Sequence, residues 1–188
     1  MKTKNVFVRC AVLAVAALAL VCLSVGAASA ETREELTAKA RASLDRLYST
    51  TPEAKELRGR AVGVLVFPDI LKAGLIVGGS GGNGVLFASD GRVLGYYNAA
   101  SLSFGLQAGA ENFSEAMIFV SSDALKYLEK SDGWSIGAGP NVVLVDAGMA
   151  KDLSSTTLRS DVYAFIYAQK GLMGGIGIQG QKITKLNP

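Results

Sequence analysis

Histidine is absent from the sequence, and its only two cysteines, Cys10 and Cys22, both lie within the first 30 residues. Without histidine, catalytic sites of the Ser-His-Asp and Cys-His types are excluded. For residues 31–188, disulfides and zinc or copper sites with Cys and His ligands are excluded as well. What remains for an enzyme is a carboxylate pair, a Ser-Lys pair or a metal site with oxygen ligands alone, and no carboxylate pair is placed for acid–base chemistry. We expect no catalytic residues, no metal site and no cofactor.

The first 30 residues have the three parts of a secretory signal peptide. Three basic residues precede an uninterrupted apolar run at 11–21, and Ala-Ser-Ala at 28–30 is a small-x-small cleavage site. The apolar run is shorter than the about 20 residues that a membrane-spanning helix needs. We therefore expect cleavage near Ala30 and a mature chain that is periplasmic or associated with the cell envelope.

Cys22 leaves a second interpretation open, because a cysteine late in an apolar run can accept a lipid. Lipoprotein sites favour a small residue directly before the cysteine and a leucine three positions before it, but this sequence has Val21 and Ala19 there. Lipidation of Cys22, which would make the chain an outer-membrane lipoprotein, is thus the disfavoured alternative.

Neither sign of charge is in excess once this segment is removed. Three of the 19 basic residues and none of the 16 acidic residues precede residue 31, so residues 31–188 carry 16 of each. The formal charge of +3 and the pI of about 8.9 for the full sequence therefore do not indicate nucleic-acid binding. The remaining chain is long enough for one domain with a packed core.

Residues 31–59 have the pattern of helices. Apolar residues recur every three or four positions from Leu36 to Tyr48, which is typical of a helix with one buried face. Thr51 and Pro52 are expected to begin a second helix, and Gly59 to end it.

From residue 60 the pattern changes to the alternation that is typical of strands. About seven to ten short antiparallel strands are expected, with one helix inserted at 123–130 and a hairpin turn at Asp90-Gly91. Pro68-Asp69 is expected to separate two of the first strands, and the last three runs are expected at 162–168, 171–179 and 182–186. The predicted fold class is α+β: a mainly antiparallel β structure with N-terminal helices and the one inserted helix. Many glycines within the strands favour a strongly curved sheet, a sandwich or a partly closed barrel. The helical segment 31–59 and the β-rich domain 60–188 are expected to pack as one globular unit.

The segment Gly-Ser-Gly-Gly-Asn-Gly at 79–84 matches the pattern G-x-G-x-x-G. A dinucleotide site needs a helix directly after this loop, but a strand-like run begins at Val85. The segment is therefore interpreted as a flexible connection between two strands. Its alternative role is a backbone site at which Gly79 and Gly81 contact an anionic headgroup.

Four basic residues lie near the predicted strand ends, at Arg58, Arg60, Lys72 and Lys170. Each alone is typical of a solvated surface. Together at one rim they would contact lipid phosphates through charge-assisted hydrogen bonds. The aromatic stripe Tyr163, Phe165 and Tyr167 is interpreted as core.

An ordered set of segments resembles the SYLF domain family, over about Arg60 to Leu186. The segments are Val-Leu-Val-Phe-Pro at 64–68, the glycine-rich 78–84, Ser-Phe-Gly-Leu-Gln-Ala-Gly at 103–109, Ala-Leu-Lys-Tyr-Leu at 124–128 and the stretch 167–180. The resemblance implies binding of membrane lipids, with phosphoinositide binding and some actin contact in eukaryotic members. Those members use a basic N-terminal helix, whereas residues 31–49 here have four basic and four acidic residues.

These observations favour an exported, non-enzymatic module that binds membrane lipid or phospholipid headgroups at the bacterial envelope. Actin is set aside, because an exported bacterial chain would not meet it, and no nucleic acid is expected. The alternative is a structural envelope protein that contacts a partner protein through Leu36, Leu44 or Tyr48 on its apolar helix face. An enzyme acting on lipids is the third hypothesis.

Overall fold

The computed structural model describes residues 31–131, 133–146 and 160–186. Helices α2 (Arg33–Thr50) and α3 (Pro52–Leu57) and the 3₁₀-helix η1 (Arg58–Arg60) come first. The elements that follow are β1 (Gly63–Ala88), β2 (Val93–Phe119), α4 (Ser122–Lys130), β3 (Trp134–Ser135), β4 (Val142–Asp146) and β5 (Val162–Lys185). The predicted α+β class is confirmed. Gly59 lies inside η1 and does not end a helix as expected, because the chain continues as a 3₁₀ turn from Arg58.

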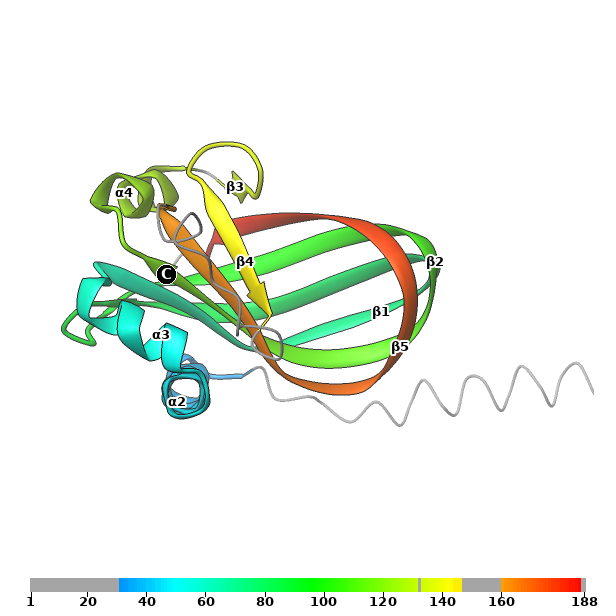
Figure 1. Cartoon of the computed structure of the whole chain (residues 1–188), viewed down its shortest axis with the longest axis horizontal. Coiled ribbons are helices and arrows are strands. Elements are labelled where there is room, and N and C mark those ends of the chain that lie inside the picture. The colour runs from blue at the N-terminus through cyan, green and yellow to red at the C-terminus, as the bar shows by residue number, and fades with distance from the viewer. Residues whose placement is uncertain (1–30, 132, 147–159, 187–188) are drawn as a thin grey trace, which may run out of the picture. The chain divides into compact units, whose positions relative to one another are not determined.

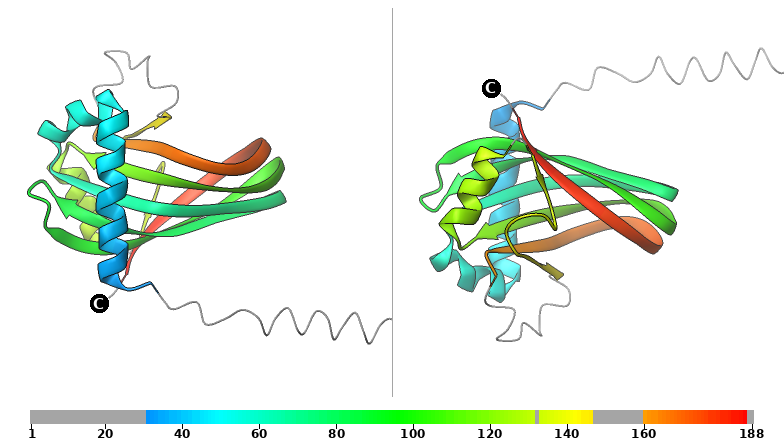
Figure 2. Two further views of the ribbon diagram at one scale, coloured as in Figure 1. Left: turned by 90° about the horizontal axis from the view of Figure 1, so that it is seen from below. Right: turned by 90° about the horizontal axis from the view of Figure 1, so that it is seen from above.

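Three long strands form the body of the sheet. β1 pairs with β2 and β2 pairs with β5, both antiparallel, while β3 and β4 extend the sheet beside β5. Each long strand bends back on itself at the end remote from the helices, so the sheet curls into a half-barrel (Figure 1, Figure 2). The expectation of a strongly curved sheet is confirmed.

The number and direction of the strands differ from the expectation. The runs that the sequence separated at Pro68-Asp69 and at 79–84 belong to the single strand β1, in which a register shift between Phe67 and Ile70 accommodates the proline. The three runs expected after Val162 likewise form the single strand β5. Because β4 runs parallel to β5, the sheet is mixed and not wholly antiparallel.

The turn between β1 and β2 confirms the hairpin predicted at Asp90-Gly91. Gly91 adopts a φ of +83°, and its N–H donates to the Ala88 carbonyl at 2.9 Å. The Asp90 carboxylate accepts a hydrogen bond from the backbone N–H of Arg92 at 3.0 Å, which lowers the pKa of Asp90. Local chemistry thus fixes this reversal, as is typical of Asp-Gly turns.

The two halves of β1 approach each other closely inside the curl. A Cβ atom at Gly84 would lie 2.4 Å from Cδ1 of Phe67, and one at Gly82 would lie 2.4 Å from the backbone oxygen of Asp69. Only residues without a side chain permit this approach. The interpretation of 79–84 as a flexible connection is therefore wrong, because the segment is a packed part of a strand.

α2 crosses one face of the sheet (Figure 2), and one hydrophobic layer lies between the helix and that face. Leu36, Ala40 and Leu47 of α2 are buried in this layer together with the aromatic stripe at 163–167. The stripe is therefore core, as predicted. Its last ring is also tied to the helix, since the hydroxyl groups of Ser43 and Tyr167 lie 2.8 Å apart.

A second hydrophobic layer lines the inside of the curl, and α4 packs against it. Ala124 and Leu128 of α4 pack here against the fully buried Trp134 and its neighbours. The indole N–H of Trp134 donates to the Ala138 carbonyl at 3.0 Å, so its one polar group is satisfied. The predicted inserted helix is confirmed, and its cap is the Ser121 hydroxyl, which accepts from the Ala124 N–H.

Candidate functional site

The bend of the three long strands carries no charged side chain. The sequence has no Asp, Glu, Lys or Arg at 73–89, at 93–110 or at 171–181. These segments meet at the bend, since Ala108 of β2 pairs with Leu75 of β1 and with Gly174 of β5. One end of the sheet therefore lacks the ionic groups that keep an exposed surface well hydrated.

Among the side chains that the structure describes, seven large apolar ones are exposed around this bend, and we call them the apolar rim. The rim consists of Leu71, Leu75, Ile76, Val77, Leu102, Phe104 and Leu172. Their exposed fractions run from 54% at Val77 to 90% at Leu172. Exposed apolar side chains gathered on neighbouring strands mark an interaction surface on a folded domain.

In the bend, the polar side chains of β2 are buried and its apolar side chains are exposed, which is the reverse of a strand with one face toward water. Ser101 and Ser103 are 8% and 2% exposed, whereas Leu102 and Phe104 between and beside them are 63% and 59% exposed. The buried hydroxyl of Ser101 lies 2.5 Å from that of Ser80 on β1, so its polarity is satisfied inside the curl. The strand thus places its serines inside and its apolar side chains outside.

The reversal of β1 holds Ile76 in a strained backbone conformation. Its φ is +69°, in the left-handed region that β-branched residues rarely adopt. Gly74 and Gly78 bracket it so tightly that a Cβ at Gly74 would lie 2.4 Å from the Cα of Gly78. Such strain costs about 1–3 kcal/mol and is typical of functional sites. Here it keeps an apolar side chain exposed at the turn of the strand.

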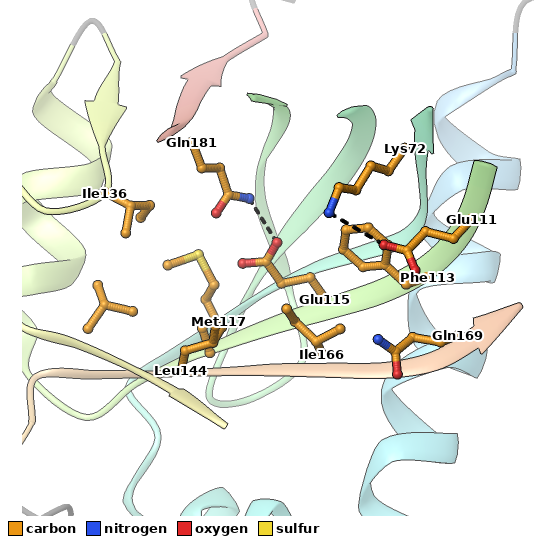
Figure 3. A pocket seen from close by; sticks show the side chains of 12 residues that line it. Lys72, Glu111, Phe113, Glu115, Met117, Ile136, Leu144, Ile166, Gln169 and Gln181 are labelled. Carbon is orange, nitrogen blue, oxygen red and sulfur yellow. Dashed lines mark hydrogen bonds and ion pairs between the residues drawn. The ribbon is translucent and has the colours of Figure 1, made fainter. Parts of the chain in front are cut away.

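A cavity of about 380 Å³ lies inside the curl (Figure 3). Its apolar walls are Phe113 and Met117 of β2, Ile136 just after β3, Val142 and Leu144 of β4, and Ala164 and Ile166 of β5. Its polar lining consists of Lys72, Glu111, Glu115, Gln169 and Gln181. A mostly apolar cavity with a few convergent polar groups is typical of a small-molecule site.

Glu115 is the buried ionisable group of this cavity, with only 4% of its surface exposed. Burial raises the pKa of its carboxyl group to about 7, while a hydrogen bond from Gln181 Nε2 to its Oε2 at 2.8 Å opposes that rise. In the described part of the chain, no Lys or Arg forms an ion pair with it. Below about pH 7 the cavity therefore holds a neutral carboxylic acid.

Lys72, predicted as a lipid-contacting residue, lines the same cavity. Its ammonium lies 3.6 Å from Oε1 of Glu111, and the two side chains are about one-fifth exposed, at 21% and 22%. The positive charge of Lys72 is therefore countered within the cavity and does not stand at an outer rim.

Lys170, also predicted as a site residue, belongs to a groove on the outside of the sheet. The groove has a volume of about 530 Å³, and Lys39 and Arg46 of α2 and Asp69 also line it. We call this groove the basic groove. Leu71 and Lys170 both pair with Asn112, so they lie in one row across the three strands. The basic groove therefore adjoins the apolar rim.

The other predicted site residues lie elsewhere. Arg58 places its guanidinium 5.5 Å from the centre of the Tyr48 ring, and Arg60 is exposed in η1. Gly79 and Gly81 lie within β1 and pair with residues of β2. The structure does not gather the four basic residues at one rim, because Arg58, Lys72 and Lys170 line three different hollows. Their contact with lipid stays a prediction.

Sequence reasoning missed Glu115 and the apolar rim. A signal for the rim was present, because three long segments without charge occur in a chain of 16 acidic and 19 basic residues. A weaker signal marked Glu115, which directly precedes the apolar run from Ala116 to Val120. Neither signal shows that these segments face one another across a curl.

The described ranges contain no group of three or more acidic, Cys or His side chains that could hold a metal ion. None of their helices combines the length and the apolar character needed to cross a membrane.

Comparison with known proteins identifies one region of the chain. A family model described as "Ysc84: Las17-binding protein actin regulator" matches residues 100–187. This match covers most of β2 and all of α4, β3, β4 and β5. A search of curated proteins finds no match to the chain.

Proposed function

The chain carries a region of the SYLF (Ysc84) family at residues 100–187, and from this premise we propose that it binds a lipid membrane through the apolar rim. The main support for the proposal is the reversed alternation of β2, in which Leu102 and Phe104 are exposed while the neighbouring serines are buried. Full transfer of a Leu or Phe side chain out of water gains about 1.5–3 kcal/mol. Partial insertion of several rim residues therefore suffices for a stable attachment.

The basic groove supplies the second element of this docking geometry. Lys170 lies two residues before Leu172, the most exposed member of the rim at 90%. When Leu172 enters the hydrocarbon, the Lys170 ammonium lies near the depth of the headgroups. There it attracts lipid phosphates, with each basic residue contributing about 1 kcal/mol on an anionic surface.

The double substitution Leu102→Asp with Phe104→Asp tests the insertion. Both side chains are more than half exposed, so the fold should tolerate the change. We expect vesicle binding to fall about 100-fold, because roughly 3 kcal/mol of apolar transfer is lost. Co-sedimentation with vesicles of neutral phospholipid measures this partition.

Val93→Asp is the matched control, since Val93 is an exposed apolar residue of β2 beside the hairpin turn, at the end away from the bend. It should sediment as the wild type does. Equal sedimentation of the double variant and the wild type would contradict insertion of the rim.

A second substitution, Lys170→Glu, separates headgroup attraction from insertion. We expect it to weaken binding to anionic vesicles by about tenfold and to leave binding to neutral vesicles unchanged. The difference should shrink at high salt, because exposed charges are screened. Equal losses on both kinds of vesicle would contradict a headgroup contact for Lys170.

We further propose that the segment 1–30, which lies outside the described residues, directs export and is removed near Ala30. The proposal rests on the signal-peptide pattern, and it would bring the apolar rim to a membrane of the bacterial envelope. The intact mass of the protein recovered from bacterial cells should correspond to a chain beginning at Glu31. A mass that retains Cys22 with attached acyl groups would instead establish the lipoprotein alternative.

Protein binding is the second candidate, because the matched family's description includes Las17 binding and actin regulation. The apolar face of the N-terminal helix does not provide that contact. Leu36 is buried, and Leu44 and Tyr48 pack against the chain's own core. A protein partner would therefore have to use another surface. The matched description names a binding protein and no reaction, so catalysis stays the third hypothesis.

A further inference from the structure

The cavity inside the curl is a second site, which docking through the apolar rim does not use. Its volume of about 380 Å³ lies near the lower end of the range of about 300–1,000 Å³ that is typical of small-molecule sites. Seven of its twelve lining side chains are apolar. A chamber of this size suits one hydrocarbon chain better than the two chains of a diacyl lipid.

Two polar groups of the cavity meet at one part of its wall. Glu115 of β2 and Gln181 of β5 point toward each other across the curl, beside Met117 and Ile136 (Figure 3). Their hydrogen bond uses one of the two N–H groups of Gln181 and one of the two oxygens of Glu115. An ionised carboxyl group in an apolar cavity lowers the stability of the folded protein. Residues that lower stability in this way are typically found at functional sites.

The charges of the lining disfavour an ionic ligand. An anion would lie beside the carboxyl groups of Glu111 and Glu115, while Lys72, the one cation among the described lining residues, is already paired at 3.6 Å. A cation would meet apolar walls and a Glu115 carboxyl whose pKa is raised to about 7 by burial. A hydroxyl group both donates and accepts, so it fits Gln181 and either protonation state of Glu115.

We propose that this cavity binds one molecule of an uncharged amphiphile, a single acyl chain whose head carries hydroxyl groups. The chain lies against Met117, Ile136 and Ile166, and the hydroxyl groups bond to Glu115 and Gln181. Such a molecule forms hydrogen bonds with Glu115 and Gln181 without adding a charge to the cavity. This binding does not depend on whether the apolar rim inserts into a membrane.

Calorimetric titration of the purified protein with monodecanoylglycerol, below its micelle concentration and at about pH 6, tests the proposal. We expect saturable binding of one molecule per chain. Decanoate and decyltrimethylammonium have a chain of similar length with a negative or a positive head. Each should bind at least about tenfold more weakly, because an ionic head must lose its hydration in the cavity.

Two variants locate the binding in the cavity. Leu144→Asp changes a wall residue that is 65% exposed, so the fold should persist while affinity falls at least about tenfold. Glu115→Leu removes the hydrogen bond to the head and should weaken binding about tenfold. Val93→Asp, at an exposed apolar residue outside the cavity, should bind as the wild type does.

Three results would overturn the inference: no saturable binding of monodecanoylglycerol, equal or tighter binding of decanoate, or wild-type affinity in Leu144→Asp. No vesicle is present in the titration, so a failure of membrane docking cannot produce any of them. Conversely, if the protein docks on vesicles but does not bind monodecanoylglycerol, the proposed membrane docking stands and the proposed amphiphile site in the cavity is wrong.

Discussion

Replacing Glu115 with Gln should stabilise the folded protein at neutral and alkaline pH and leave its stability unchanged in mild acid. Burial raises the pKa of this carboxyl from 4.5 to about 7 in the folded state. Between these values the unfolded chain releases the proton while the folded chain keeps it. As pH rises through this range, the free energy of unfolding therefore falls by about 3 kcal/mol in total, and above the range it is constant.

The amide of the Glu115→Gln variant has nearly the same shape and stays neutral at every pH. Its oxygen can still accept the hydrogen bond that Gln181 donates at 2.8 Å in the wild type. The variant should therefore gain about 3 kcal/mol in free energy of unfolding at about pH 8 and almost nothing at about pH 4.5. Other carboxylates titrate in both proteins, so their contributions cancel in the difference.

Urea denaturation of both proteins across this pH range measures the effect. Glu111→Gln is the control, because Glu111 lines the same cavity but is partly exposed and paired with Lys72. That substitution should not reproduce the pH-dependent gain. A constant difference between wild type and Glu115→Gln at all pH values would show that Glu115 is not protonated in the folded protein at neutral pH.

Adding one methyl group at Gly82 should be strongly destabilising, while the same change at Gly81 should be harmless. A Cβ at Gly82 would lie 2.4 Å from the backbone oxygen of Asp69 and 3.1 Å from the Cα of Ile70. Backbone atoms cannot move aside as a flexible side chain can, so the two halves of β1 must separate. We expect Gly82→Ala to lower the free energy of unfolding by about 3 kcal/mol.

Gly81→Ala is the matched control, because its Cβ would lie at an ordinary 3.6 Å from the Ala99 oxygen. Removal of a glycine also restricts the unfolded chain, so this variant should be unchanged or up to about 1 kcal/mol more stable. Thermal and urea denaturation of both variants measures the contrast. Equal stability of the two variants would mean that the halves of β1 do not pack as closely as described.

The features that the sequence predicted correctly are those fixed by residues close in the chain. The Asp90-Gly91 turn and the helix after Ser121 each depend on a few consecutive residues. The helix from Arg33 to Thr50 follows from its own apolar spacing. The aromatic stripe at 163–167 was correctly assigned to the core because three alternate positions are large and apolar.

The errors concern contacts between distant residues. Pro68 suggested the end of a strand, but it lies at a bulge in β1, which is an edge strand and tolerates the missing N–H. The glycines at 82 and 84 suggested flexibility. In the structure they instead allow the close approach of Asp69 and Phe67 from the other half of β1, which the sequence alone does not show. The parallel direction of β4 depends likewise on which edge of β5 it meets.

The candidate site was the least predictable part for the same reason. Alternation along β2 separated Ser101 and Ser103 from Leu102 and Phe104, but alternation alone does not say which face is inside. In a water-facing strand the apolar set is buried, and here the bend places it outside. The four predicted basic residues were grouped by their nearness to strand ends, and the curl separates those ends.

The register of the long strands also implies an order of folding. We expect the β1–β2 hairpin to close first at its turn, at Phe87↔Val93, and to lengthen one pair at a time, because these contacts are local in the chain. β5 must instead find β2 across large separations, up to the pair Tyr97↔Lys185, so its docking should be the slow step. Ala164, Ile166 and Gln181 of the cavity all arrive with β5. Ligand binding to the cavity should therefore appear only in the last kinetic phase of refolding, later than the recovery of hairpin structure.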